Sequence, residues 1–311
     1  MTKPAARDHG GGLDAAVSRF GGARAEWIDL STGINPTPYP VPELTADAWT
    51  ALPDSAAMTR LIDAARAFWN VPDHLDILAA PGASSLIAQL PRLANAGTVR
   101  IDAPTYNEHA AAFHMHGWQV SKANAATRVV VHPNNPTGAF WDEIEPNKLT
   151  IIDESFCDVA PNRSLIDRAG NGTLVLKSFG KFWGLAGVRL GFLIGDTAQV
   201  DRVRQWQGPW AVSGAAMGIG AHALADHAWA NAMRAKLEIN ADRLDQLVTK
   251  AGADLVGGTS LFRLYAVDNA ATWQDRLAQH HIWSRIFPYS KTWLRLGLPP
   301  AHGWDMLKAA L

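Results

Sequence analysis

The sequence is poor in cysteine and has no long apolar run. Cys157 is the single cysteine among 311 residues, so no disulfide can form within the chain, and a reducing compartment fits this composition. No uninterrupted apolar run reaches the ~18 residues that a membrane-spanning helix needs. The opening segment MTKPAARDHGGG contains no apolar stretch. We therefore expect no signal peptide, no membrane partner and a cytoplasmic protein.

An excess of charge of either sign is also missing. Lys and Arg number 28 against 29 Asp and Glu, which gives a formal net charge of −1. A nucleic-acid partner, which calls for a basic surface, is not indicated. The chain shows no repeat or low-complexity tract, and its 48% hydrophobic content suffices for a large core shared by two lobes. The 13 tryptophans are scattered, so we interpret them as packing residues rather than as a motif.

Short apolar runs alternate with helical patterns in the middle of the chain. The expected strands are residues 75–79, 98–102, 128–132, 149–153, 173–177 and 190–194. The expected helices are residues 84–94, 107–116 and 198–207. Strands separated by helices favour βαβ units, and parallel strands covered on both faces read as continuous apolar runs. The sequence therefore predicts an α/β fold with a large domain built on a mostly parallel sheet.

The pattern of expected helices and strands changes after Pro209. The expected elements there are long helices at 214–226 and 229–251, short strands at 261–265, 282–286 and 293–296, and helices at 272–280 and 303–311. This pattern predicts a smaller α+β domain at the C-terminus. We expect an arm over residues 1–34 that joins the small domain, a large domain over 35–224 and the small domain over 225–311.

Lys181 stands in the segment SFGKFWGLAGVRLGF, residues 178 to 192, which follows an expected strand. A lysine acts as a nucleophile only after losing its proton, and that requires a confined site with few neighbouring carboxylates. Ser178 and Arg189 lie nearby in sequence and are able to hold an anion, and the glycines allow close approach of the backbone. On this segment alone, a glycine-rich turn with a solvated lysine stays open.

Asp153 ends the apolar run LTIID, and the carboxyl edge of an open α/β sheet is where ligands bind. An aspartate there can pair with a protonated pyridine nitrogen and keep the ring able to accept electrons. A plain helix N-cap is the alternative for Asp153. Asn135 in HPNNPTG also follows a strand and can donate to a phenolate oxygen, although the same residues make a good turn.

Two further strand ends carry candidate ligands. APGASS, residues 80 to 85, offers Gly82, Ala83 and Ser84 at a helix N-terminus, where backbone N–H groups can cradle a phosphate; it lacks the Gly-Lys-Ser/Thr of a Walker loop. Tyr106 in PTYNEH can stack on a flat ring. An ordinary N-cap and a half-buried tyrosine are the alternatives.

Arg295 lies in the apolar run WLRLGLP, residues 293 to 299. A buried arginine is unfavourable unless it is paired, and a bidentate contact with a substrate carboxylate would explain it. The alternative is an alternating strand with Arg295 on the solvent face.

These residues, in this order, resemble the fold-type I pyridoxal-phosphate (PLP) enzymes, the aspartate-aminotransferase-like superfamily, over nearly the whole chain. The resemblance implies that Lys181 binds the PLP aldehyde as an imine and that Asp153 pairs with the ring nitrogen. It also implies that Asn135 contacts the ring oxygen and that Tyr106 stacks on the ring. The implied phosphate ligands are Gly82, Ala83, Ser84, Ser178 and Arg189. Arg295 would bind the substrate carboxylate, and a homodimer is implied because the family usually forms one.

The segments HGGGLDAAVSRFG, residues 9 to 21, and DLSTGINPTP, residues 29 to 38, resemble one subfamily. It comprises the threonine-phosphate decarboxylases of cobalamin biosynthesis, which are close relatives of the histidinol-phosphate aminotransferases. The resemblance implies L-threonine O-3-phosphate as the substrate, and CO₂ and (R)-1-aminopropan-2-ol O-2-phosphate as products. His9 and Asn35 would lie near the substrate, with His9 a candidate for its phosphate.

Three departures from the family pattern bear on the site. Leu52 stands where many relatives carry a tyrosine that reaches the neighbouring subunit's cofactor phosphate. Phe156 stands where many aminotransferases carry a tyrosine near the ring oxygen, and a phenylalanine cannot donate that hydrogen bond. Only 17 residues, 136 to 152, separate Asn135 from Asp153, so we expect the helix of this crossover to be shortened or lost.

Two other functions stay open. An aminotransferase of the histidinol-phosphate type would use the same residues around the cofactor, and a non-catalytic PLP-fold scaffold would need no reactive lysine. A metal site is not expected. His109, His114 and His116 share one expected helix, but 114 and 116 point to different faces, so we interpret all three as solvated. The His280–His281 pair is interpreted in the same way.

Overall fold

The computed structural model describes residues 8–145 and 147–311, which belong to two compact units. Unit 1 combines the chain up to Thr37 with residues 136–138 and 236–311. Unit 2 combines residues 38–135 and 139–235. The first seven residues of the expected arm lie outside the described residues. The domain boundaries expected at residues 35 and 225 stay predictions.

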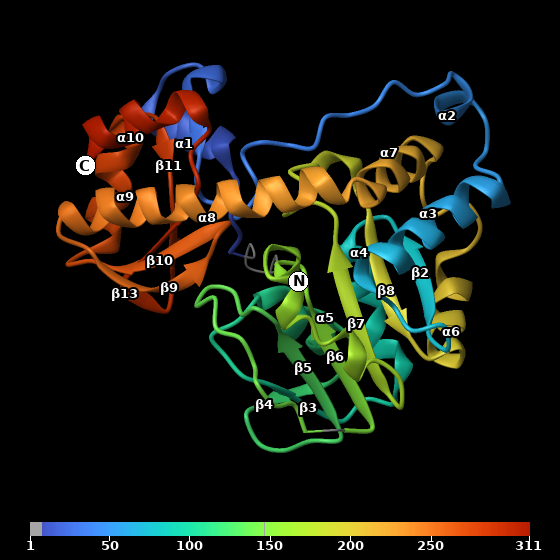
Figure 1. Ribbon diagram of the computed structural model, residues 1–311. Helices are drawn as coiled ribbons and strands as arrows, with labels where there is room; N and C mark the ends of the chain where they lie inside the picture. Colours follow the sequence, from blue (N-terminus) through green and yellow to red (C-terminus); the bar gives the residue numbers. More distant parts are fainter. Residues whose placement is uncertain (1–7, 146) are drawn as a thin grey trace. The chain divides into compact units, whose positions relative to one another are not determined.

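Unit 2 is built on a seven-stranded sheet. Its strands are β2 (Asp76–Ala80), β3 (Thr98–Ile101), β4 (Gln119–Ser121), β5 (Thr127–Val131), β6 (Leu149–Asp153), β7 (Thr173–Ser178) and β8 (Gly191–Gly195). They lie in the order β2-β8-β7-β6-β5-β3-β4, and Figure 1 shows β5, β6 and β7 side by side. β8 runs antiparallel to both neighbours, and the other strands are parallel to one another. The prediction of a mostly parallel sheet is confirmed.

Unit 2 also contains helices, several of which pack on this sheet. They are α2 (Asp47–Thr50), α3 (Ser55–Trp69), α4 (Ala83–Gln89), α5 (Asn107–Met115), α6 (Thr197–Gln207), α7 (Gly214–Ala225) and the first part of α8 (His227–Lys250). The carboxylate of Asp54 caps α3 by accepting from the Ala57 N–H at 2.7 Å. The sequence reading missed α3, although its buried residues Leu61, Ala65 and Trp69 recur every four positions, as a helix facing a core requires.

Unit 1 combines short strands with helices, as the pattern after Pro209 predicts. Its elements are α1 (Leu13–Phe20), β1 (Ile28–Asp29), the later part of α8, β9 (Asp254–Thr259), β10 (Phe262–Ala266), α9 (Ala270–Gln279), β11 (Ile282–Trp283), β12 (Arg285–Phe287), β13 (Ser290–Gly297) and α10 (Trp304–Ala310). β12-β13-β10-β9 form an antiparallel sheet, and β1 pairs in parallel with β11. The single strand expected at 282–286 is thus two strands in two sheets. The buried Ser284 separates them, and its carbonyl accepts from the Gln274 amide at 2.8 Å.

An aromatic stack shows what some of the tryptophans do. The fully buried indole of Trp183 stacks on Trp229, with ring centroids 5.4 Å apart, and on Phe179 at 5.3 Å. The packing role expected for tryptophan is confirmed here. Trp49 and Trp210 differ, because their side chains are mostly exposed.

Two expectations about missing elements can be checked on the described residues. Between β5 and β6, residues 132–145 and 147–148 contain no helix, so the crossover helix of the family pattern is lost there. Within residues 8–145 and 147–311, no helix combines the length and apolarity that crossing a membrane requires.

Candidate active site

The carboxyl edge of the unit 2 sheet gathers the residues that the motifs single out. Asp153 is the last residue of β6, Ser178 is the last of β7, and Lys181 follows three residues later. Asn135 follows β5, and Tyr106 follows β3 as the N-cap of α5. Parallel neighbours end at the same edge of a sheet, so four separate strand ends deliver polar side chains to one place.

A cradle for an anion lies where α4 begins. Gly82 precedes α4 with φ +85°, and a Cβ built there would lie 2.6 Å from Nη2 of Arg189. The positive φ favours glycine here, and the missing side chain leaves room for the guanidinium against the start of the helix. Gly191 pairs with Ser178 across β7 and β8, and a Cβ on Gly191 would lie 2.4 Å from the backbone nitrogen of Ala83. Backbone N–H groups, the Ser178 segment and a guanidinium thus converge.

The cradle has the composition of a phosphate site. Arg189 is exposed and donates to the carbonyl of Ala186 at 3.1 Å, and no carboxylate of the described part of the chain forms a salt bridge with it. Ser84 is exposed in the first turn of α4. Free N–H groups at a helix start and a guanidinium are the donors that phosphate oxygens prefer.

Asp153 contacts His109, a histidine that the sequence analysis interprets as solvated. The Oδ2 atom of Asp153 lies 2.7 Å from Nε2 of His109, and both side chains are almost fully buried. The other carboxylate oxygen accepts from the backbone N–H of Ser155 at 2.9 Å and from its hydroxyl at 2.5 Å. Burial alone would raise the pKa of Asp153, but the bond to His109, the charge of that histidine and the two Ser155 bonds together lower it. Asp153 therefore stays ionised in the interior.

The interpretation of His109 as a solvated helix histidine is wrong, whereas His114 and His116 are exposed as expected. His109 lies in the first turn of α5, so it is delivered to the same sheet edge as Asp153. Its ring also meets Tyr106 edge-on, with centroids 6.0 Å apart. The signal that was available is its position three residues after Tyr106, just past a strand end.

Lys181 is half-buried beside an aromatic face. Its Nζ lies 5.5 Å from the ring centroid of the buried Phe156. Nearby, Asn134 fixes the segment that carries Asn135, because it accepts from the Thr105 hydroxyl at 2.6 Å and donates to the Pro104 carbonyl at 3.1 Å. The loops after β3 and β5 are thus tied together.

Unit 1 holds the other predicted site residues. Arg295 on β13 is buried, so the interpretation that places it on a solvent face is excluded. Its Nη2 donates to the Ser31 carbonyl at 2.6 Å, and its cross-strand partner on β12 is another arginine, Arg285. Burial, and then the charge of Arg285, lower the pKa of Arg295 to about 10. The sequence reading missed Arg285, because the pairing of β12 with β13 could not be inferred from the chain alone.

The glycine-rich segment 9–12 docks against these strands. The backbone of Gly10 lies so close to Ser31 that a Cβ would be 2.5 Å from its carbonyl oxygen, and the N–H of Gly11 donates to the Ser31 hydroxyl at 2.6 Å. Asp8 forms a bidentate ion pair with Arg285, with distances of 2.6 and 2.8 Å. The same guanidinium donates to the carbonyl of His9, whose side chain is exposed.

Asn35, the third predicted substrate residue, is buried. Its side-chain oxygen accepts from the Thr37 N–H at 2.9 Å, which forms a local turn. The predicted site residues therefore fall into two sets. Those for the cofactor belong to unit 2, and His9, Asn35 and Arg295 belong to unit 1.

One buried group in unit 2 has the residue types of a metal site. Ligand atoms of His132, Glu154 and Cys157 lie within 4.8 Å of one another. The ammonium of Lys177, however, lies 2.6 Å from Oε2 of Glu154 and already supplies the positive charge. Burial strongly raises the pKa of the Cys157 thiol, so it stays protonated and a poor ligand. The group is better described as a buried ion-pair cluster.

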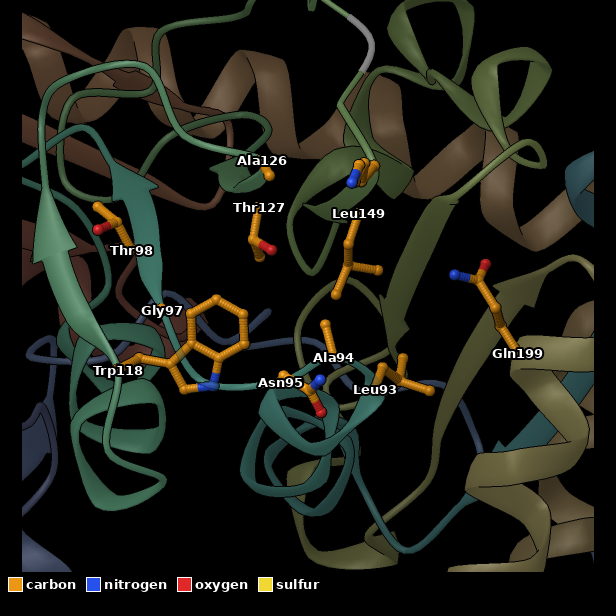
Figure 2. A pocket seen from close by; sticks show the side chains of 11 residues that line it. Leu93, Ala94, Asn95, Gly97, Thr98, Trp118, Ala126, Thr127, Leu149 and Gln199 are labelled. Atoms are coloured by element: carbon orange, nitrogen blue, oxygen red, sulfur yellow. The ribbon is translucent and has the colours of Figure 1, made fainter.

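A pocket of about 260 Å³ lies at the opposite edge of the unit 2 sheet. Figure 2 shows that Thr98, Thr127 and Leu149 border it, and these are the first residues of β3, β5 and β6. Ligands of open α/β sheets bind at the carboxyl ends of the strands, so this pocket is not the candidate active site.

Comparison with known protein families gives one family match. Residues 25–311 match the family described as aminotransferase class I and II. This match covers nearly the whole chain, including both sets of predicted site residues except His9.

Individual relatives are similar over their full length. A threonine-phosphate decarboxylase of Sinorhizobium sp is 39% identical over 96% of this chain and 95% of its own. A threonine-phosphate decarboxylase of Pseudomonas aeruginosa is 34% identical over 98% of this chain and 97% of its own. Among solved structures, the histidinol-phosphate aminotransferase of Sinorhizobium meliloti in complex with pyridoxal-5'-phosphate has a TM-score of 0.80. It is 18% identical and covers 97% of this chain and 93% of its own, so it supports the fold alone.

Proposed function

Because the chain belongs to the aminotransferase class I and II family, we propose that it is a PLP-dependent carboxy-lyase that decarboxylates L-threonine O-3-phosphate. The product is (R)-1-aminopropan-2-ol O-2-phosphate, a precursor in cobalamin biosynthesis. The observation that carries the proposal is the cluster at the carboxyl edge of the unit 2 sheet, where a lysine, a buried aspartate and an anion cradle meet. The choice of reaction and substrate is supported by the two relatives that are at least 34% identical over nearly the whole chain.

The residues fit the proposed cofactor. The cradle accounts for its phosphate, with Gly82, Ala83, Ser84, Ser178 and Arg189 as ligands. PLP supplies an aldehyde that condenses with amines and a pyridine ring that accepts electrons when protonated. Asp153 is suited to hold the ring-nitrogen proton, because its carboxylate stays ionised in the interior and His109 fixes its orientation. Tyr106 provides a stacking face, and Asn135 an amide donor for the ring oxygen.

Lys181 has two roles in the proposed reaction. Its Nζ would hold the cofactor through the PLP aldehyde, and it would be free as an amine while the substrate is bound. Once CO₂ has left, the freed amine moves a proton to the substrate Cα. Phe156 lies beside Nζ and has no hydrogen-bond acceptor, so the proton on the lysine is not shared with that side chain.

The arginines of unit 1 suit a substrate with two acidic groups. We assign the substrate carboxylate to Arg295, and we add Arg285 as a ligand of the substrate phosphate together with His9. Like charges on directly opposed strand positions destabilise a sheet, so the Arg285–Arg295 pair is best explained by anions that bind there. Asn35 shapes the neighbouring turn.

A homodimer in the cytoplasm completes the proposal. The exposed fractions of Trp49, Leu52 and Trp210 in unit 2 are 68%, 67% and 58%, which is unusual for large apolar residues of a monomer. We expect a second copy of the chain to cover them. Leu52 cannot donate a hydrogen bond, so the tyrosine contact known in relatives is not reproduced by this residue.

The deciding experiment mixes the purified holoenzyme with O-phospho-L-threonine and measures CO₂ release. Stoichiometric CO₂, with no dependence on a keto acid, is the expected result. Amino transfer to a keto acid without CO₂ would identify an aminotransferase instead. A protein that takes up PLP without developing the visible absorbance of a lysine-bound cofactor would identify a scaffold.

A further inference from the structure

The ends of β6 and β7 carry an ion pair on the face opposite the candidate site. Asp153 of β6 is in register with Leu176 of β7, and the N–H of Glu154 donates to the Leu176 carbonyl at 2.9 Å, so Glu154 lies alongside Lys177. Successive side chains of a strand point to opposite faces. Glu154 and Lys177 therefore point away from the face that receives Asp153 and Ser178.

The pair is short and fully enclosed. Nζ of Lys177 lies 2.6 Å from Oε2 of Glu154, and both side chains are at most 1% exposed. Asp158 lies 3.6 Å from the same Nζ, and its carboxylate accepts from the indole N–H of Trp69 at 2.9 Å. Arg234 donates to the backbone carbonyl of Asp158 at 2.7 Å. Two carboxylates and two cations thus balance one another in this cluster.

Glu154 also fastens the chain beneath the sheet edge. Its two carboxylate oxygens accept from the hydroxyl of Ser164 at 2.7 Å and from the N–H of Leu165 at 2.5 Å. The contacts with Lys177, Ser164 and Leu165 all end on one side chain that directly follows Asp153, so a shift of Glu154 shifts Asp153.

His132 extends this support to the next strand. Its Nε2 donates to the Arg163 carbonyl at 2.6 Å, its Nδ1 accepts from the Trp141 N–H at 3.1 Å, and its own N–H donates to the Asp153 carbonyl at 2.8 Å. Burial lowers the pKa of His132, which keeps the ring neutral and both bonds fixed. The segment leading from His132 to Asn135 therefore begins at a fixed point.

We propose that Lys177 and Glu154 are positioning residues, whose buried ion pair fixes the spacing between the carboxyl ends of β6 and β7. This inference rests on the proposed function, because that spacing sets the distance between Asp153 at the ring nitrogen and Ser178 at the phosphate of the same cofactor. A rigid cofactor held at both ends tolerates little change in it.

The test compares two variants with wild-type holoenzyme. Glu154→Gln removes the charge at nearly the same volume and keeps one of the two oxygen acceptors, which can still serve the Leu165 N–H. The double variant Lys177→Met/Glu154→Gln removes one charge of each sign at similar volume, so the net charge of the cluster is unchanged and Asp158 keeps its bond to the Trp69 indole. Urea unfolding first establishes that each variant folds. The readouts are the rate at which bound PLP is lost to an excess of an apo-enzyme acceptor and the pH midpoint of the visible absorbance.

We expect the double variant to release PLP about tenfold faster than wild type and to shift the absorbance midpoint. Glu154→Gln leaves the buried Lys177 ammonium without its nearest carboxylate and should do so at least as strongly. Arg128→Leu is the matched control, because Arg128 is a buried cation near the other end of β5, 3.4 Å from Asp102. We expect it to lower stability without changing PLP release. Variants that match wild type in both release and midpoint would overturn the inference, as would equal release by the control. A wild-type protein that takes up no PLP would overturn the proposed function as well.

Discussion

Lys177 in unit 2 and Arg295 in unit 1 are both buried cations, and their surroundings act on them in opposite ways. Burial by itself lowers the pKa of each group. Around Lys177, the charges of Glu154 and then Asp158 outweigh burial and raise its pKa. Around Arg295, the neighbouring charge of Arg285 adds to burial, and the pKa falls to about 10.

The difference distinguishes a charge that supports structure from one that suits a ligand. The ion pair of Lys177 with Glu154 is complete within the protein, so removing either partner leaves an uncompensated charge in the interior. Arg285 and Arg295 are like charges on opposed strand positions. Asp8 pairs with Arg285, and a further anion bound there would offset the remaining repulsion. A buried cation therefore supports the structure in unit 2, whereas in unit 1 it suits the binding of an anion.

Arg295→Gln gives the largest expected effect. Loss of the charge-assisted contact to the substrate carboxylate should lower kcat/KM by about 10²–10³-fold, while the free energy of unfolding changes little because repulsion from Arg285 is relieved. Steady-state kinetics and urea unfolding check the two parts. Arg263→Gln is the control on the adjacent strand β10. Its guanidinium lies 2.7 Å from Asp245, so this variant should lose stability and keep kcat/KM. A loss of stability in Arg295→Gln together with a loss of kcat/KM in Arg263→Gln would contradict the assignment of Arg295 to the substrate carboxylate.

Arg285→Gln should have the next largest effect, a fall of about 10–100-fold in kcat/KM for the phosphorylated substrate. The loss should be absent in the binding of unphosphorylated L-threonine, which separates a phosphate ligand from a carboxylate ligand. Arg19→Gln serves as the control, because Arg19 forms an exposed pair with Asp275 in the same unit. An equal loss for both ligands would remove Arg285 from the phosphate site.

Asp153→Asn tests a third buried charge through pH. The pKa of Asp153 is lowered in the folded state, so its contribution to stability is present above the ordinary value of 3.8 and is lost as the pH falls through the lower folded value. At pH 7 the apo variant should therefore be less stable than wild type by about 2 kcal/mol. This difference should shrink as urea unfolding is repeated at decreasing pH below 4. A constant difference would mean that the carboxylate is not favoured by its surroundings.

Asp8→Asn gives the smallest expected effect. The Asp8 carboxylate occupies Arg285, where we place the substrate phosphate, so the two anions compete. Removing the charge of Asp8 should tighten the binding of inorganic phosphate by about 2–3-fold, as measured by calorimetry. Asp14→Asn is the control, since Asp14 pairs with the exposed Arg24 instead. Weaker phosphate binding in Asp8→Asn would show that Asp8 orders the site rather than competing for it.

The sequence predicts those site residues that directly follow a strand. Apolar runs mark the strands, and Asp153 and Ser178 follow from the rule that ligands bind at their carboxyl edge. His109 and Arg285 escaped prediction for a physical reason. Their partners, Asp153 and Arg295, lie 44 and 10 residues away, and contact depends on how a helix start or a strand register brings them together. β9 was also missed, because its exposed Leu255 and Val256 and its paired glycines give no inward-outward alternation.

The most direct measurement is to reduce the PLP-loaded protein with borohydride and map the labelled peptide by mass spectrometry. The account predicts a single pyridoxyl group on Lys181 and none on Lys177, which lies four residues earlier in the chain and whose ammonium is paired with Glu154. A label on any other lysine, or no label at all, would contradict it.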